Sequence, residues 1–452
     1  MSVDPKTGLL VGAWLLTTPV FAATATLSGR LHHTDGTFAA AKLVALENGR
    51  PHFDETTNQT PVRAFIFDGA SSTNTVRRPM NRALLHDGSS ISGRLVSVSD
   101  DEVVIQPGYA DPVAIRRVAV RSLRWIDHAA SGSYEGPYQT NRWIISPLAE
   151  PGGETNRPSW KLEDGMFVSQ GRGTLACEVE MPTVSRVEFD LHWRNIPRFR
   201  MAFYARDTHH YSFTEGYRFY SPGHGIIFAM TRSTNPKQSV ELSKAPVPAL
   251  VNSNFVHLDF RLNTQSGEGW LFADGKEVRH WTDLGYSGSG TALIFYNFKK
   301  QTRLGIANLR VSRWDGRTAH EPKPAANGNT LVFKNGDTTL TDRFTLSGTN
   351  LTFRHNDSWL TIPTSRVTQI FLPGSAPATD AESLWIRFQR GDWIRAQLLA
   401  LTDSSLTWRH PAGTTQHETA LAHLRGLHLS PSKPVMDLSW YLPTMSAPAG
   451  KP

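Results

Sequence analysis

The chain has 452 residues, enough for several domains that each bury a core, so a single domain is not expected. Cys177 is the only cysteine, which excludes an intrachain disulfide and a cysteine-based zinc site. The formal net charge of +7 is spread thinly and lacks the Lys/Arg cluster typical of nucleic-acid binding, so we expect no nucleic-acid partner.

The first 25 residues have the pattern of a secretory signal peptide. An apolar run from Leu9 to Leu16 follows Lys6, and small residues at alternate positions then lead to Ala22 and Ala25. This order predicts cleavage after one of these alanines and export to the periplasm, surface or exterior of a bacterium. A buried N-terminal strand or helix is the alternative. No apolar run reaches the ~20 residues of a membrane-spanning helix, so we expect no integral membrane span.

Apolar and polar residues alternate with a period of two through the middle of the chain. The run from Val187 to Arg194 alternates without a break, as in a strand that buries one face. Similar runs, separated by Gly, Asn, Pro and Asp, are Arg200 to Asp207, Phe255 to Leu262, Gly269 to Ala273, Ala292 to Phe298 and Leu304 to Trp314. No long amphipathic helix competes with them, so we predict an all-β protein with a two-sheet sandwich at its centre.

A spacing of apolar residues occurs three times around this centre. Each copy contains a turn glycine, and apolar residues follow it ten and fifteen positions later. The three sets are Gly88 with Val98 and Val103, Gly336 with Leu346 and Leu351, and Gly391 with Leu401 and Leu406. Each copy ends with three further positions that have the same spacing in all copies. They are Ile115, Val120 and Leu123; Ile362, Val367 and Ile370; and Thr419, Leu424 and Leu427. Such short copies should close into small barrels or pair with a sibling.

These patterns divide the chain into seven segments. We predict a signal peptide (1–25), a β-rich N-terminal segment that we do not place in the repeat (26–74), three repeats (75–128, 328–373 and 382–430), a central sandwich (134–317) and a Pro-rich tail (431–452).

The central segment resembles a concanavalin-like, laminin-G-type jelly roll, of the subtype found in bacterial 3-keto-disaccharide hydrolases. The residues that carry the resemblance are Trp160 to Phe167, Val187 to Arg194, Leu271 to Val278 and Val311 to Gly316. Asp274-Gly275 independently predicts a hairpin turn, because Gly accepts the positive φ that primed turns need. The resemblance implies a two-sheet sandwich that binds a saccharide on its concave face or loop rim. The three repeats resemble Sm-like or SH3-like small barrels in pattern and size.

No complete catalytic or metal-binding set is found. Glu188 and Asp190 match the first two carboxylates of a jelly-roll glycosidase strand, but His192 and Trp193 stand where the general acid is needed. No Asp-x-Asp spacing concentrates calcium ligands, and no His pair has the spacing of a zinc site. We therefore predict no metal and no cofactor, and we assign no catalytic residue.

The strongest remaining signal for function is a mixture of aromatic and arginine side chains. Aromatic rings stack on sugars, while Arg, Asp and His exchange hydrogen bonds with hydroxyl groups. The predicted ligand-binding residues are Glu188, Asp190, His192, Arg194, Arg200, Tyr204, Arg206, Tyr220 and His224. We expect the first four to share a binding surface with Arg200, Tyr204 and Arg206 from a second strand.

These observations favour an exported, non-catalytic binding protein whose partner is a glycan or cell-envelope polysaccharide, with other envelope proteins as further partners. Two alternatives stay open. One is a carbohydrate-active hydrolase or lyase that uses Asp190 and His192. The other is a scaffold that docks proteins through its repeats.

Overall fold

The computed structural model describes sixteen stretches of the chain. They are residues 27–34, 37–54, 61–68, 81–126, 134–137, 141–147, 159–163, 166–208, 216–231, 239–282, 290–299, 302–314, 325, 327–378, 382–389 and 391–429. The predicted signal peptide and Pro-rich tail lie outside them. Within these stretches the chain is built of β-strands with one short α-helix, α1 (Ala249–Asn252), which confirms the all-β prediction. No helix in them is long and apolar enough to cross a membrane.

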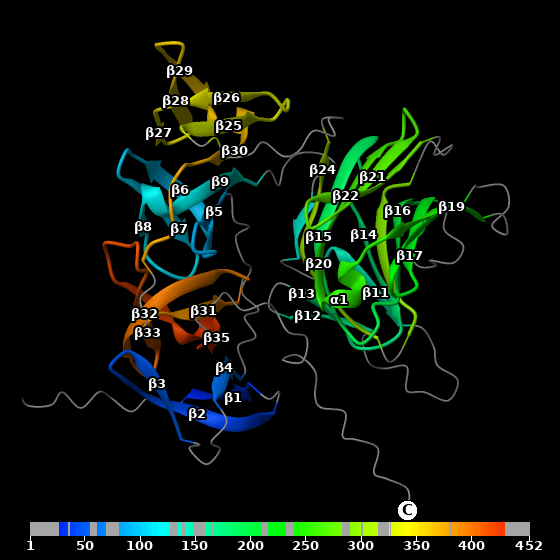
Figure 1. Ribbon diagram of the computed structural model, residues 1–452. Coiled ribbons are helices and arrows are strands. Elements are labelled where there is room, and N and C mark those ends of the chain that lie inside the picture. The colour runs from blue at the N-terminus through cyan, green and yellow to red at the C-terminus, as the bar shows by residue number, and fades with distance from the viewer. Residues whose placement is uncertain are drawn as a thin grey trace, which may run out of the picture.

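Two antiparallel sheets form the central sandwich (Figure 1). The first, which we call the β15 sheet, contains β10 (Tyr134–Gly136), β12 (Trp160–Glu163), β13 (Met166–Ser169), β15 (Val184–Arg194), β20 (Phe255–Asn263), β21 (Glu268–Ala273), β22 (Lys276–Trp281) and β24 (Arg303–Arg313). The second, the β16 sheet, contains β11 (Trp143–Pro147), β14 (Gly173–Glu178), β16 (Phe199–Ala205), β17 (Gly216–Ser221), β18 (Gly225–Thr231), β19 (Ser239–Pro246) and β23 (Ala292–Asn297).

Alternation along these strands builds the core of the sandwich. Every second residue of β15 points inward, where Phe189 meets Phe295 of β23 edge to face with ring centroids 5.1 Å apart. Phe260 of β20 meets Phe203 of β16 in the same way at 5.2 Å. Such pairs contribute about 1 kcal/mol each beyond the burial of their area, so they hold the two sheets face to face.

The remaining strands form a column of four small units beside the sandwich (Figure 1). The N-terminal copy has β1 (Leu27–His33), β2 (Phe38–Glu47), β3 (Arg50–Phe53) and β4 (Val62–Phe67). The Gly88 copy has β5 (Asn81–Leu85), β6 (Ser90–Val98), β7 (Glu102–Pro107), β8 (Val113–Arg116) and β9 (Val120–Trp125). The Gly336 copy has β25 (Asn329–Phe333), β26 (Thr338–Thr341), β27 (Phe344–Ser347), β28 (Asn350–His355), β29 (Ser358–Pro363) and β30 (Val367–Phe371). The Gly391 copy has β31 (Leu384–Phe388), β32 (Trp393–Leu401), β33 (Ser405–Arg409), β34 (His417–Ala420) and β35 (Leu424–His428).

The N-terminal segment is a fourth copy of the repeat, which the sequence did not reveal. Its first strand pairs with its last, Leu31 opposite Phe65, as Ala83 lies opposite Leu123 in the Gly88 copy. The same pairing joins β25 to β30 and β31 to β35. In the sequence, Gly36 of Asp35-Gly36 corresponds to the turn glycine of the other copies. The residue fifteen positions later is Pro51, where the other copies have Val or Leu, so the spacing of apolar residues does not identify this copy.

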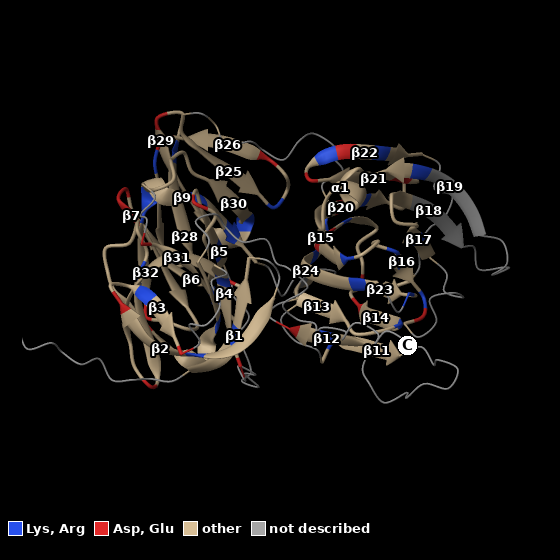
Figure 2. Cartoon of the chain, turned by 60° about the horizontal axis from the view of Figure 1, so that its bottom comes forward, with Lys and Arg blue, Asp and Glu red and all other residues tan. Residues whose placement is uncertain are grey.

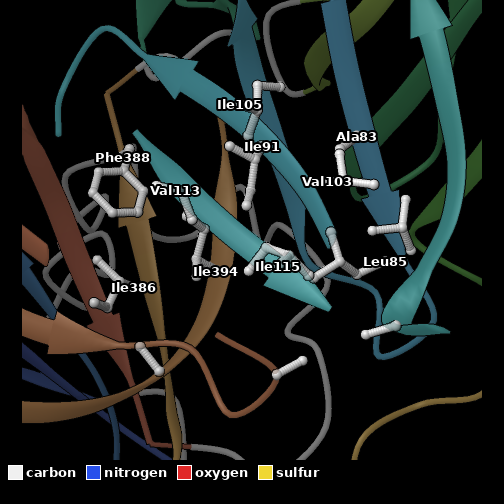
Figure 3. Packing of buried hydrophobic residues seen from close by; sticks show 14 of the residues in the cluster. Ala83, Leu85, Ile91, Val103, Ile105, Val113, Ile115, Ile386, Phe388 and Ile394 are labelled. Carbon is white, nitrogen blue, oxygen red and sulfur yellow. The ribbon is translucent and has the colours of Figure 1, made fainter. Parts of the chain in front are cut away.

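Neighbouring copies share one hydrophobic core. The column runs in the order N-terminal, Gly391, Gly88 and Gly336 copy, shown blue, orange, cyan and yellow in Figure 1. Figure 3 shows Ile115 and Val113 of the Gly88 copy beside Ile394 and Phe388 of the Gly391 copy. Each copy therefore completes its core by pairing with a sibling, as its small size requires.

The outer face of the β15 sheet lies against the column. Met166, Val168 and Ala307 of the sandwich form a buried cluster with residues of the column that include Trp385 and Trp393. The β16 sheet lies on the side of the sandwich away from the column (Figure 1). Figure 2 shows acidic and basic segments scattered over both bodies, in keeping with the thinly spread net charge.

Candidate functional site

A row of polar aromatic and arginine side chains crosses the outer face of the β16 sheet. Arg200 of β16 lies opposite Tyr296 of β23 on one side and opposite Tyr220 of β17 on the other. Met201 and Phe219, their chain neighbours, are buried in the core, so alternation directs Arg200 and Tyr220 to the outer face. We call Tyr296, Arg200 and Tyr220 the tyrosine–arginine row. All three are half-buried.

Phe298 extends this row beyond the end of β23. Its ring stacks beside that of Tyr296 with centroids 6.2 Å apart. The guanidinium of Arg200 lies 4.7 Å from the centroid of Phe298, and the Lys299 ammonium lies 5.6 Å from it. These cation–π contacts attach Arg200 and Lys299 to the aromatic end of the row.

A buried apolar cluster lies next to the row. Ala202 of β16 lies between Ile294 of β23 and Arg218 of β17. Ala202 and Ile294 are fully buried in a cluster with Ala176, against which Tyr296 packs. Tyr296 of the row is therefore anchored against a buried apolar cluster.

Tyr204 is not part of this surface, contrary to the prediction from strict alternation. The pairing of β16 with β23 shifts register between Ala202 and Ala205, and Tyr204 takes a φ of 54°. Its ring turns into the core, where its hydroxyl donates to the backbone carbonyl of Pro182 and lies 2.7 Å from Ser185 Oγ. Burial raises the pKa of Tyr204 above its ordinary value, so this phenol stays protonated.

Two other predicted residues lie just beyond the ends of strands in the β16 sheet. Arg206 is exposed directly after the end of β16. His224 is exposed in the turn that joins β17 to β18. Neither is a direct cross-strand neighbour of Arg200 in the described pairing.

The four predicted residues of β15 lie on the opposite sheet, so the expected shared surface is wrong. β15 pairs with β20 and β24, whereas β16 pairs with β17 and β23. Glu188, Asp190 and His192 leave the core on the outer face of the β15 sheet, the sheet that lies against the column. Consecutive strands of a jelly roll can belong to different sheets, which period-two alternation does not reveal.

Glu188 is the centre of a network of arginines. Its carboxylate is 2.7 Å from Arg186 Nε, 3.3 Å from a guanidinium nitrogen of Arg124 in the Gly88 copy, and 3.8 Å from Arg310. Burial by itself raises the pKa of Glu188, but Arg186 and Arg124 outweigh it and lower this pKa. Glu188 is therefore an ionised link between the sandwich and the column.

Asp190 forms an ion pair of its own on the same face. His257 Nδ1 lies 2.7 Å from one carboxylate oxygen, and Asn308 Nδ2 donates to the other at 2.6 Å. These hydrogen bonds outweigh the effect of burial and lower the pKa of Asp190. Burial alone lowers the pKa of His257, but Asp190 raises it to about 9. The pair is charged at neutral pH.

The remaining two residues of β15 have ordinary structural surroundings. His192 is buried, with its ring 4.9 Å from that of Phe255 on β20. Arg194 is exposed at the end of β15, opposite Arg303 of β24. Burial and the charge of Arg194 together lower the pKa of Arg303.

Sequence reasoning missed two aromatic residues of the site, Tyr296 and Phe298. The run from Ala292 to Phe298 was expected to be a strand, and placing Leu293 and Phe295 inward would have directed Tyr296 outward. What the sequence lacked was the neighbour relation between β23 and β16, which are about ninety residues apart. Within the described stretches, no group of three His, Cys, Asp or Glu residues lies close enough to hold a metal ion.

Comparisons with known proteins find similarity in three-dimensional structure alone. No protein-family model and no curated protein sequence matches this chain. A carbohydrate-binding module, CBM66 from Bacillus subtilis, is 11% identical, with 39% of this chain and 100% of that chain covered at a TM-score of 0.28. The carbohydrate recognition domain of Emp47p is 11% identical over 42% of this chain and 99% of its own, with a TM-score of 0.30. LamAcat from Zobellia galactanivorans is 11% identical, with coverages of 41% and 96% and a TM-score of 0.29. Similarity at this level assigns no function to this chain.

Proposed function

We propose that this protein is a non-catalytic, glycan-binding protein and that its binding surface is the outer face of the β16 sheet. The observation that carries the proposal is the tyrosine–arginine row on three neighbouring strands. Strands lie about 4.8 Å apart, so Tyr296 and Tyr220 are separated by about 10 Å with Arg200 between them. A ligand that touches both tyrosines extends across three strands, as an extended saccharide chain does.

The chemistry of the row suits a sugar. Tyrosine combines an apolar ring face for the C–H side of a sugar with a hydroxyl for its polar rim. Arg200, which contacts the ring of Phe298, adds a planar guanidinium, a group that suits hydroxyl and carboxylate oxygens.

The rival proposal of a hydrolase that uses β15 is weakened by the state of its carboxylates. A glycosidase general acid needs a raised pKa so that it holds a proton near neutral pH. The pKa values of Glu188 and Asp190 are both lowered by their cationic partners. His192, which that alternative pairs with Asp190, is buried against Phe255. These side chains act in ion pairs and packing.

Affinity electrophoresis in gels containing laminarin, xylan, polygalacturonate or dextran tests the proposal. We expect at least one polysaccharide to retard the protein, and Tyr296→Ala and Tyr220→Ala to abolish most of that retardation while melting normally. Phe255→Ala, an aromatic replacement on the opposite sheet, is the matched control. Retardation that survives both tyrosine replacements would place the site elsewhere. Release of reducing ends during incubation would contradict the non-catalytic part.

Export of the chain is a further part of the proposal, supported by the apolar and small residues of the first 25 positions. Intact-mass measurement of protein from the native cell should show loss of the first 22 to 25 residues. A mature protein that starts at Met1 would contradict it.

A further inference from the structure

The strand pairings between copies of the column are centred on equivalent residues, and two kinds of pairing set the order of the copies. In the first kind, the last strands of two copies pair: Ile370 lies opposite Leu123, and Leu427 opposite Phe65. Each of these four residues is the partner of the first strand in its own copy. The Gly336 copy is joined in this way to the Gly88 copy, and the Gly391 copy to the N-terminal copy.

The second kind of contact, which we call the turn interface, joins the Gly88 copy to the Gly391 copy. Ser90 pairs with Trp393, and each lies two positions after its own turn glycine. Asp392 accepts a hydrogen bond from the backbone N–H of Ser92 at 2.8 Å. The equivalent bond runs in the other direction, from the N–H of Arg395 to Ser89 Oγ at 3.0 Å. The two copies are thus related by a local twofold axis.

Side chains on both sides bury this turn interface. The ring of Tyr109 stacks on Phe388 with centroids 4.0 Å apart, and its hydroxyl donates to Asp392. His410 pairs with Asp87 at 3.1 Å. Val113 of β8 is fully buried there in the core shared with the Gly391 copy.

The Gly336 copy presents the same face at the end of the column, where no sibling covers it (Figure 1). Leu340 occupies the position of Ser92 and is 59% exposed, whereas Ser92 is 5% exposed. Leu360 occupies the position of Val113 and is 42% exposed. Trp359, its neighbour on the edge strand β29, is 55% exposed.

We propose that this open face binds a second copy of the same chain, Gly336 copy to Gly336 copy, about a twofold axis. The occupant follows from the internal pattern, in which every strand pairing between copies is centred on equivalent residues. In a twofold contact, Leu340, Trp359 and Leu360 of one chain cover the same residues of the other. The interface therefore buries two copies of each apolar side chain. The dimer continues the alternation of contacts along the column.

The opposite end of the column is a poorer partner for this face. In the N-terminal copy, the position equivalent to Leu340 is Ala40, which is exposed. A head-to-tail contact between the two ends would bury Leu340 against this small side chain and would extend into an open filament, because it does not close.

A single cysteine substitution tests the arrangement. Thr338 is equivalent to Ser90 and Trp393, which face each other directly across the turn interface. Directly paired residues have Cα atoms about 5 Å apart, within the range that a disulfide bridges. Under mild oxidation we expect Thr338→Cys to form a covalent dimer in the full chain. The native thiol, Cys177, is buried and does not compete. Ser404→Cys, in an exposed turn of the Gly391 copy, is the control that should stay monomeric on a denaturing gel.

Sedimentation of the full chain gives an independent measurement. We expect a reversible dimer in the wild type, and at least a tenfold rise in the dimer dissociation constant in Leu340→Asp, because exposed Leu340 is replaced without disturbing a core. Leu399→Asp, at another exposed leucine in the Gly391 copy, should leave the dimer intact. A monomeric wild type at about 100 μM would overturn the proposal. A mixture of Thr338→Cys and Phe38→Cys chains reports the head-to-tail contact. A disulfide between these two chains, with none in Thr338→Cys alone, would also overturn the proposal.

Discussion

The two outer faces of the sandwich carry similar residue types and use them in different ways. On the β15 sheet, arginines surround Glu188 and Asp259 in a network of ion pairs that reaches the column. On the β16 sheet, Arg200 lies on the ring of Phe298 between two tyrosines. The difference is in the partner that each arginine finds. Alternation shows which side chains leave the core, but it does not show which partners those side chains find.

The two faces also differ in their position within the molecule. The β15 sheet lies against the column, and its charges meet Arg124 of the Gly88 copy. The β16 sheet is on the far side (Figure 1). Replacements on the first face should therefore change stability, and replacements on the second should change binding. Replacements of Glu188, His257 and Arg200 test this division.

The largest expected effect is that of Glu188→Gln. Removing this charge leaves three arginines that still repel each other near a buried site, so the free energy of unfolding should fall by about 3 kcal/mol. Urea denaturation measures this value. Glu163→Gln is the matched control, because Glu163 pairs with the exposed Lys161 and should cost less than about 1 kcal/mol. Equal losses in the two variants would show that the Glu188 network contributes nothing special.

A smaller effect is expected from His257→Gln, and it depends on pH. Asp190 raises the pKa of folded His257 to about 9, above the value of about 6.5 in the unfolded chain. The stabilisation is therefore complete below pH 6.5 and is lost as the pH rises through 9. Because this side chain is 36% exposed, solvent screening limits the effect to about 1 kcal/mol.

Urea denaturation at pH 6.0 and at pH 9.5 checks this sign. The variant should be less stable than the wild type at the lower pH, and the difference should shrink at the higher pH. A difference that stays constant between the two conditions would mean that the proton on His257 does not contribute to folding.

The smallest change in stability is expected on the β16 sheet. Arg200→Ala should alter the free energy of unfolding by less than about 0.5 kcal/mol and weaken polysaccharide binding by about 1 kcal/mol, roughly fivefold. Arg194→Ala, on the other sheet, is the matched control and should bind normally. Calorimetric titration with the polysaccharide that retards the wild type in the gel gives both affinities. If Arg194→Ala weakens binding as much as Arg200→Ala, the two faces do not differ in the way proposed here.

Much of the strand structure was predictable from the sequence, because it depends on near neighbours. Alternation located β15, and the Asp274-Gly275 pair located the turn between β21 and β22, where both residues have positive φ. Three repeat copies were found from a glycine and two apolar positions that recur at constant spacing. Strand period and turn chemistry are local properties, so a short stretch of sequence is enough to express them.

Only the tertiary structure decided which surfaces these strands form. β15 and β16 follow each other in the chain but belong to opposite sheets, because each pairs with strands that come later in the sequence. The register shift that turns Tyr204 inward depends on β23, and the N-terminal copy is recognised by its pairing because its spacing differs. A binding face is made of cross-strand neighbours, and the free energy that selects them comes from the packing of distant segments.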